Sequence, residues 1–208
     1  MIEIGNVIWD GFEAAVRGMR NPLNSWKLSD SKFDRNTNTF AIGDKDLRLM
    51  HKLYASGPEH SKFLRFINVS MDISAPLYWW KEMDTYKFQE TNSTSTMHKL
   101  MERPFTMNDF STEHLDDDEV EFFKEILGRL NANRLLYISE ENPELKKSWW
   151  WNNIQLLPSS YNQKRTVCTN YANLINIYRQ RKNHKLDEWH TMCDVISFLP
   201  YMRDIIGE

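Results

Sequence analysis

Several segments of the chain carry hydrophobic residues at helical spacing. Residues 44–54 place Leu47, Met50 and Leu53 on one face after an acidic first turn, which predicts a helix that ends at Gly57. Other segments with helical spacing are the stretch after Pro76, residues 116–130, Pro143 to Leu157, the stretch after Asn170, and Leu186 to Ile206. We expect Pro200 to bend or break the last of these helices, because proline removes a backbone donor.

One segment alternates instead with a period of two. From Phe63 to Ile73, hydrophobic residues point one way and Asn68, Ser70 and Asp72 point the other, which predicts a half-buried strand. A helix is expected to open at residues 74–76, where a proline near the first position costs nothing. Residues 165–169 form a shorter β-like stretch, and Asn170 is a plausible N-cap for the helix that follows.

Two long polar segments separate these elements. Residues 25–43 and 91–113 are rich in Asn, Asp, Ser and Thr and are predicted to be loops. Loops of this length inside a compact domain are usually functional or disordered. Neither segment marks a domain boundary, because the flanking elements share one composition, so we expect a single domain over residues 1–208.

Four consecutive acids, Asp116 to Glu119, precede a run with Val120, Phe123, Leu127 and Leu130. Such a cluster can indicate a metal site. The dipole of a helix also favours acids at its N-terminus, and this second interpretation is the stronger one.

The charge balance narrows the class of partner. Twenty-six basic and 29 acidic residues leave a net charge of −3, whereas general nucleic-acid binders show a basic excess. The chain is rich in aromatic residues, with eight Trp, eight Tyr and eleven Phe. Aromatic residues suit planar ligands, cores and subunit interfaces alike. Because Trp149 to Trp151 cannot all face one core, at least one ring is expected to meet a partner subunit or a ligand.

No targeting or membrane segment is recognisable in the sequence. The first residues carry acids, and no apolar run approaches the roughly 20 residues that span a bilayer. Cys168 and Cys193 form no CxxC pair, and the six histidines lack ligand spacing. Signatures of serine hydrolases, zinc proteases and nucleotide-binding loops are also missing. The residues alone therefore predict a cytoplasmic, soluble α/β domain without a metal, and they leave a cofactor enzyme open.

The order of certain short motifs carries more information. His60 precedes the predicted strand, Ala75-Pro76 follows it, and then come a helix and a Ser/Thr/Asn loop. This order resembles the flavin-dependent thymidylate synthases. In that family the helix ends in an Arg-His-Arg signature, which falls here on residues 85–87 (Thr-Tyr-Lys). The family's next Asn and Ser fall on Asn92 and Ser95.

The C-terminal half resembles the same family independently. Leu157-Pro158, Asn170, Asn176 and Arg181 follow one another as in the family's series, with Trp189 after a one-residue insertion. Residues 16–20 are similar, more weakly, to the family's first helix.

The resemblance implies an α/β (α+β) fold with a central antiparallel-rich sheet flanked by helices. It also implies a homotetramer in which FAD takes hydride from NADPH and relays a methylene from methylenetetrahydrofolate to dUMP, which gives dTMP. No protein nucleophile is required, so the catalytic residues stay unknown. The cofactor-binding residues implied are His60, Tyr86, Lys87, Asn92, Asn170 and Asn176. The substrate-binding residues implied are Glu82, Ser95 and Arg181.

Departures from the family pattern keep other functions open. Residues 85–87 retain one cation, the Glu and the Arg expected near Ser95 are gone, and Ile154 replaces another arginine. Lysine is a point charge and does not replace the forked donors of arginine. The sequence offers four basic residues as replacements: Lys81, Lys99, Lys164 and Arg165. The alternatives are a non-catalytic homologue that binds flavin or nucleotide, and an oligomeric interaction protein.

Each implied site residue also has a purely structural explanation. His60 could cap a backbone group, and Asn170 is an N-cap in either case. Lys87 and Arg181 lie near the C-terminal ends of predicted helices, where the helix dipole favours cations. Ser95 lies in a Ser/Thr-rich loop and is the least specific of the set.

Overall fold

The structure is a computed structural model that describes residues 2–37 and 39–208. The chain divides into two compact units, both within the domain predicted for residues 1–208. The hairpin unit comprises residues 2–3, 73–85 and 92–165, and the cavity unit comprises residues 4–72, 86–91 and 166–208. In the described residues, no helix is long and apolar enough to cross a membrane.

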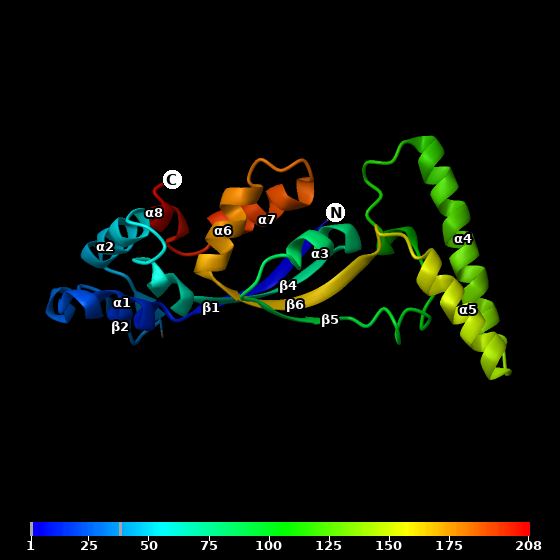
Figure 1. Ribbon diagram of the computed structural model, residues 1–208, viewed down its shortest axis with the longest axis horizontal. Helices are drawn as coiled ribbons and strands as arrows, with labels where there is room; N and C mark the ends of the chain where they lie inside the picture. Colours follow the sequence, from blue (N-terminus) through cyan, green and yellow to red (C-terminus); the bar gives the residue numbers. More distant parts are fainter. Residues whose placement is uncertain (1, 38) are drawn as a thin grey trace. The chain divides into compact units, whose positions relative to one another are not determined.

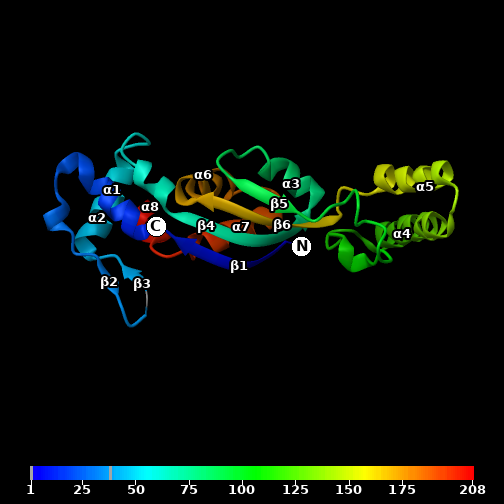
Figure 2. The same ribbon diagram turned by 90° about the horizontal axis from the view of Figure 1, so that it is seen from below.

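A four-stranded sheet contains β1 (Glu3–Asp10), β4 (Asn68–Pro76), β6 (Asn162–Asn170) and β5 (Glu90–Ser93) in the order β1-β4-β6-β5 (Figures 1 and 2). The backbone N–H of Tyr171 donates to the Ile67 carbonyl, and that of Leu77 donates to the Tyr161 carbonyl. Each bond pairs one end of β6 with the opposite end of β4, so these strands are antiparallel. An antiparallel sheet combined with helices confirms the expected α/β (α+β) fold class.

The strand predicted over residues 63–73 begins later and ends later. Residues 62–66 form the 3-10 helix η3 (Lys62–Phe66). The adjacent residues Phe63 and Leu64 are both buried, which an extended strand with a two-residue period does not allow on one face. At the other end, Pro76 is extended and precedes α3 (Leu77–Met83) as its N-cap, so the proline lies outside the helix that it was expected to open.

In the cavity unit, helices occur both before and after the polar segment 25–43 in the sequence. These helices are α1 (Phe12–Arg20), α2 (Asp44–Ala55), α6 (Tyr171–Arg181), α7 (Asp187–Ser197) and α8 (Met202–Ile206), with the 3-10 turns η1 (Asn21–Leu23) and η2 (Trp26–Leu28). The helices predicted at residue 44 and after Asn170 are confirmed. The break at Pro200 is also confirmed, since α7 and α8 are separate helices on either side of it.

Helix α6 is central to the packing of this unit. It packs against η3 and against α7. Leu174 and Ile177 on α6, Trp189 on α7 and Ile67 before β4 are all fully buried. Burying an aliphatic side chain of this size stabilises the fold by about 1.5–3 kcal/mol.

The hairpin unit is dominated by two long helices, α4 (Asp117–Ser139) and α5 (Pro143–Leu156), which pack against each other as an antiparallel pair (Figure 1). The Asp116 carboxylate accepts the backbone N–H of Glu119 at 3.0 Å, which confirms that the acidic cluster begins a helix. The predicted loop 91–113 holds the end of β5 and the 3-10 turn η4 (Met107–Asp109). The apolar core of the hairpin unit is formed by Leu100, Phe105, Phe110, Phe123 and Leu130.

The polar segment 25–43 is more regular than predicted. It holds η2 and an antiparallel pair of short strands, β2 (Lys32–Asp34) and β3 (Thr39–Ala41) (Figure 2). Strands of three residues give no readable alternation, so the sequence pattern could not reveal this pair.

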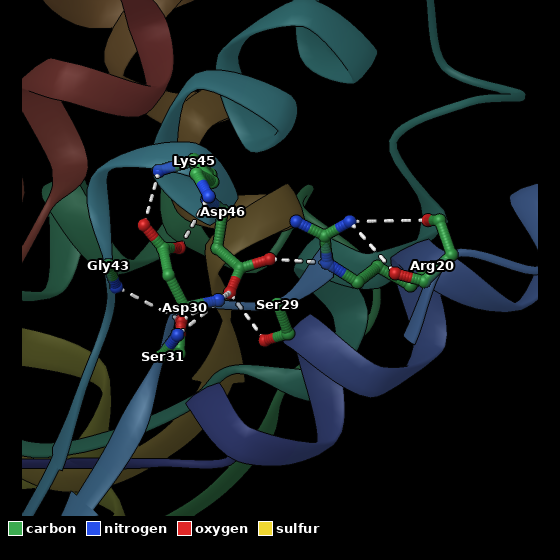
Figure 3. A network of polar contacts seen from close by, with 8 residues as sticks. Arg20, Ser29, Asp30, Ser31, Gly43, Lys45 and Asp46 are labelled. Carbon is green, nitrogen blue, oxygen red and sulfur yellow. Dashed lines mark hydrogen bonds and ion pairs between the residues drawn. The ribbon is translucent and has the colours of Figure 1, made fainter. Parts of the chain in front are cut away.

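A single buried carboxylate ties this segment to α1 and α2 (Figure 3). Asp46 on α2 accepts Arg20 Nε at 2.5 Å and the hydroxyls of Ser29 and Ser31 at 2.6 Å each. It also accepts the backbone N–H groups of Asp30 and Ser31 at 3.1 Å. In return, the Asp30 carboxylate accepts the backbone N–H groups of residues 45 and 46, which satisfies donors of the first turn of α2.

The same contacts set the pKa of Asp46. Burial alone would raise this pKa, but hydrogen bonds from Ser29, Ser31 and Arg20 outweigh burial and hold it below its ordinary value. A carboxyl group whose pKa is lowered by folding stabilises the protein above its unfolded pKa. That contribution is lost as the pH falls through the folded pKa.

We predict that Asp46→Asn lowers the free energy of unfolding by about 3 kcal/mol at pH 7, because it leaves Arg20 as an unpaired buried charge. The difference from wild type should shrink below about pH 4, where the wild type protonates Asp46 and loses the same contacts. Urea unfolding at several pH values measures this difference. Asp44→Asn, an exposed change of the same charge on the same helix, is the control. A difference that stays constant from pH 7 to pH 3 would contradict the prediction.

Candidate functional site

The junction between β6 and α6 forms one wall of the main candidate site. Asn170 ends β6, and its side-chain oxygen accepts the backbone N–H of Asn173 at 3.1 Å, which confirms the predicted N-cap. The next residue, Tyr171, is fully buried, and its hydroxyl donates to the Pro200 carbonyl at 2.9 Å. Its backbone N–H donates to the Ile67 carbonyl at 3.0 Å. The start of α6 is therefore held by its own N-cap and by contacts with two other segments, one before β4 and one after α7.

The opposite wall comes from the end of α2 and the turn into η3. Gly57 adopts φ +117°, a conformation that side chains other than glycine rarely accept. Its backbone N–H donates to the Tyr54 carbonyl, and its carbonyl accepts the N–H of His60. This tight turn ends α2 and starts η3, and η3 packs against α6.

Between these walls lies a cavity of about 560 Å³, within the size range of small-molecule sites. All of its lining belongs to the cavity unit. The lining residues are Tyr54, Ala55, Gly57, Pro58, Ser61, Leu64, Arg65, Phe88, Asn170, Ala172, Asn173, Ile175, Asn176 and Arg179.

The lining favours anions. It contains Arg65 and Arg179, and no carboxylate occurs among the described residues that form it. The Arg179 guanidinium lies 4.8 Å from the centre of the Tyr54 ring, a cation–π distance. Burial raises the pKa of Tyr54 despite the nearby Arg179, so this tyrosine is a neutral phenol at physiological pH. The cavity therefore presents positive charge beside aromatic surface.

Two amide side chains bring further donors to this cavity. Asn170 uses its oxygen to cap α6, and Asn176 uses its oxygen to accept Gln180 Nε2 at 2.9 Å. In the part of the chain that the structure describes, neither amide NH₂ group has a hydrogen-bond partner. Both groups are thus available to the carbonyl or ring-nitrogen acceptors of a ligand.

A chain of hydrogen bonds runs from Asn176 to Arg181. Gln180, which donates to Asn176, accepts the Tyr86 hydroxyl at 3.0 Å, and that hydroxyl accepts Arg181 Nε at 2.7 Å. The Arg181 guanidinium lies 4.7 Å from the centre of the Trp189 ring and 5.6 Å from that of Tyr86. The structure thereby brings three predicted site residues, Tyr86, Asn176 and Arg181, into one network within the cavity unit.

Two other predicted residues lie beside the cavity without lining it. His60 sits in the turn between the lining residues Pro58 and Ser61, with its ring exposed and its Nε2 atom 3.6 Å from Glu59 Oε1. Lys87 is exposed between Tyr86 and Phe88. Their assignment to cofactor binding stays a prediction.

The remaining three predicted residues belong to the hairpin unit. Glu82 lies on α3, Asn92 is exposed on β5, and Ser95 lines a second pocket of about 450 Å³. Ser95 Oγ accepts the backbone N–H of His98 at 3.1 Å.

This second pocket also gathers two of the four basic residues that the sequence offered as phosphate ligands. Lys99 and Lys164 line it together with Ser95, and Lys99 forms an ion pair with Glu102. The other two do not join them. Arg165 pairs with Asp84 at 2.8 Å, and Lys81 is exposed on α3.

Comparison with known structures places the fold. Two crystal structures of thymidylate synthase X (ThyX) from Helicobacter pylori, both with FAD and dUMP, resemble the chain. The first has a TM-score of 0.72 at 17% identity and covers 100% of this chain and 98% of that one. The second has a TM-score of 0.66 at 18% identity and covers 98% of each chain. The fold is that of the flavin-dependent thymidylate synthases. No protein-family model and no curated protein matches the sequence.

Within this thymidylate synthase fold, the cavity includes residues that the sequence did not single out. Tyr54, Arg65, Phe88 and Arg179 carry its charge and aromatic surface. A helical spacing could have found Arg179, because it lies three positions after Asn176 on the same helix. Tyr54 and Arg65 come from segments far away in the sequence and share no spacing with α6.

Proposed function

We propose that this protein is a flavin-dependent thymidylate synthase-like enzyme. In this proposal it binds FAD and carries out the reductive methylation of a uridine monophosphate, dUMP to dTMP, with methylenetetrahydrofolate and NADPH as co-substrates. The observation that supports it most is the cavity beside Asn170 and Asn176, in a fold whose solved examples contain FAD and dUMP.

The residues of the cavity fit a flavin dinucleotide chemically. The pyrimidine edge of a flavin presents carbonyl and ring-nitrogen acceptors, which the NH₂ groups of Asn170 and Asn176 can satisfy. The pyrophosphate of a dinucleotide carries negative charge, and Arg65 and Arg179 supply guanidinium donors that match phosphate geometry. Tyr54 and Phe88 supply aromatic surface for planar rings.

The flavin, when bound, would supply the hydride chemistry, and the protein residues bind and orient. Asn176 connects the cavity to Arg181 through Gln180 and Tyr86, so a shift of one amide alters the hydrogen bonds that orient the guanidinium. Arg181 is the arginine that remains of the family's nucleotide site, and we assign it to the substrate phosphate. Because it is stacked on Trp189, it loses little side-chain entropy when it binds.

A second candidate function is a non-catalytic homologue that binds flavin or nucleotide. The tyrosine at position 86 favours this alternative, because it stands in the family's histidine position and uses its hydroxyl on Arg181 and Gln180. Such a protein would retain flavin and would not turn over dUMP.

We predict that the purified protein is yellow and that loss of both amide NH₂ groups removes the flavin. The variant Asn170→Ser/Asn176→Ala keeps an oxygen to cap α6, so its fold should be retained. We expect its flavin content to fall at least tenfold, since two hydrogen bonds are lost. The visible absorbance spectrum measures flavin, and circular dichroism checks the fold.

Asn183→Ala, an exposed amide in the same unit, is the control and should leave flavin content unchanged. A colourless wild-type protein that takes up no added FAD would contradict the proposed function. Unchanged flavin in the double variant would show that these amides do not line the flavin site.

We predict weak binding of dUMP that depends on Arg181. With the other arginines of the family signature missing, one guanidinium only partly offsets the desolvation of a phosphate dianion. Arg181→Ala should weaken binding at least tenfold, because a charged hydrogen bond is lost. Tyr86→Phe should weaken it less, since it only frees the orientation of Arg181. Calorimetric titration of flavin-loaded protein with dUMP measures these affinities.

Lys185→Ala is the control for this titration, because it removes an exposed cation from the same unit. If Lys164→Ala rather than Arg181→Ala weakens binding, the phosphate lies in the pocket of Ser95 and Lys99. Growth of a thymidine-requiring strain that carries the gene tests turnover, and failure to complement combined with flavin binding favours the non-catalytic homologue.

We also propose that the protein assembles as a homotetramer through α4 and α5. Both helices carry large apolar side chains that are exposed in the single chain, which is typical of helices that pack on several sides. They are Phe122, Leu135, Leu136, Ile138, Leu145, Trp151 and Leu156. The start of α4 is acidic and the start of α5 carries Lys146 and Lys147 at the other end of the hairpin. An antiparallel second copy would bring these opposite charges together.

Light scattering should therefore report a mass about four times that of one chain at micromolar concentration. The double variant Leu135→Glu/Ile138→Glu should dissociate the assembly, because it places carboxylates in an apolar interface. Glu125→Gln, an exposed change on the same helix, should not. A monomeric wild-type protein would contradict the assembly.

A further inference from the structure

Phe88 combines two unfavourable features at the edge of the cavity. Its backbone has φ +63°, in the left-handed region that residues other than Gly, Asn and Asp rarely adopt. Its ring is 80% exposed, although phenylalanine is among the residues that gain most from burial. Phe88 is also one of the residues that line the cavity, together with Asn170 and Asn176.

Other described residues with a positive φ have ordinary explanations. Asn6 and Asn24 are asparagines, which tolerate this conformation. Tyr201 begins α8 and packs edge-to-face on the buried ring of Phe12 at 5.5 Å. Among the described residues with a positive φ, Phe88 is therefore the one that combines a strained backbone with a large apolar ring exposed to solvent.

One hydrogen bond links the backbone of Phe88 to the residues at the start of α6. The Thr169 hydroxyl donates to the Phe88 carbonyl at 3.4 Å and accepts Asn173 Nδ2 at 3.0 Å. Thr169 and Asn173 are both buried, and Asn173 lies on α6 beside the N-cap Asn170. The strained backbone is thus tied to the helix turn that carries the amide donors.

We infer that Phe88 is a stacking residue that holds a planar heteroaromatic ring of an anionic nucleotide in this cavity. A ring that stacks on Phe88 would place its polar edge within the same lining as Asn170 and Asn176, and its phosphates would meet Arg65 and Arg179. The strain persists because the exposed ring gains its packing only when the ligand is present. The identification of that ring as a flavin rests on the proposed function, whereas the stacking role does not.

The test uses a substitution that relieves the backbone strain at position 88. Glycine accepts φ +63° without a steric penalty, so Phe88→Gly removes the ring and relieves the backbone together. We expect the melting temperature of the ligand-free protein to rise by about 2 °C or more. The dissociation constant of the bound probe (FAD, FMN or ADP) should rise about tenfold, because a stacking contact is lost. Phe88→Tyr should retain wild-type affinity. Phe198→Ala, which removes an exposed ring elsewhere in the same unit, should also do so.

Three probes separate this inference from the proposed function: FAD, FMN and ADP, each titrated by calorimetry, with quenching of flavin fluorescence as a second readout for the first two. Tight binding of ADP but not of either flavin contradicts the flavin proposal, and the Phe88 variants are then judged on ADP. Binding of none of the three probes by the wild type overturns both proposals.

Wild-type affinity in Phe88→Gly overturns the stacking role. If that variant also has a smaller mass in light scattering, the ring contacts a second copy of the chain instead. A Phe88→Gly protein that melts below wild type contradicts the stored strain, and with it the inference.

Discussion

The candidate site depends on the way in which β6 turns into α6. Within the five residues 169–173, Thr169 donates to the Phe88 carbonyl, Asn170 caps the helix, Tyr171 donates to the Ile67 carbonyl, and Asn173 donates to Thr169. All four lie in or next to buried surroundings, so the loss of one bond leaves a polar group that water cannot easily reach. The turn therefore fixes where the amide donors of the cavity lie, and it also fixes the position of Phe88. Binding geometry and helix stability are set by the same few bonds.

Much of the fold could be predicted from the sequence where the signal is local. Hydrophobic spacing predicts the helices that begin at residues 44 and 143, and capping chemistry predicts the N-caps Asp116 and Asn170. The structure contains each of them. The pair β2 and β3 was missed because strands of three residues give no readable alternation, and because the segment before β2 is held by Asp46, which lies outside it on the helix that follows. The start of β4 was wrong because burial of two consecutive residues, Phe63 and Leu64, reflects packing of η3 against α1 and α6 and not a strand period.

The residues of the candidate site also fall into two groups, those with a signal in the local sequence and those that only tertiary packing brings to the cavity. Asn170 and Asn176 could be found because a resemblance of motif order along one stretch of chain identified them. Arg65 and Tyr54 could not, because an exposed arginine and a half-buried tyrosine have no local pattern that separates a binding role from an ordinary surface role. Their relation to α6 exists only in the folded protein, where η3 packs against α6 and Tyr54 on α2 meets Arg179. Residues that bind through tertiary proximity are therefore the ones that a single sequence conceals.

The positions of the cations bear on which phosphate ligand the cavity favours. Residues 85–87, the segment that was compared with the Arg-His-Arg signature, contain one basic side chain, and this Lys87 is exposed. The cavity, in contrast, has two arginines and no described carboxylate in its lining. Phosphate affinity depends on the number of forked donors that meet the anion. Two arginines in one cavity therefore suit a ligand with two phosphates better than a monophosphate. Arg181, which we assign to the substrate phosphate, already donates its Nε–H to Tyr86, so it has fewer donors left for that phosphate. On these grounds, the charges of the cavity support the flavin part of the proposed activity more strongly than they support the choice of dUMP as its substrate.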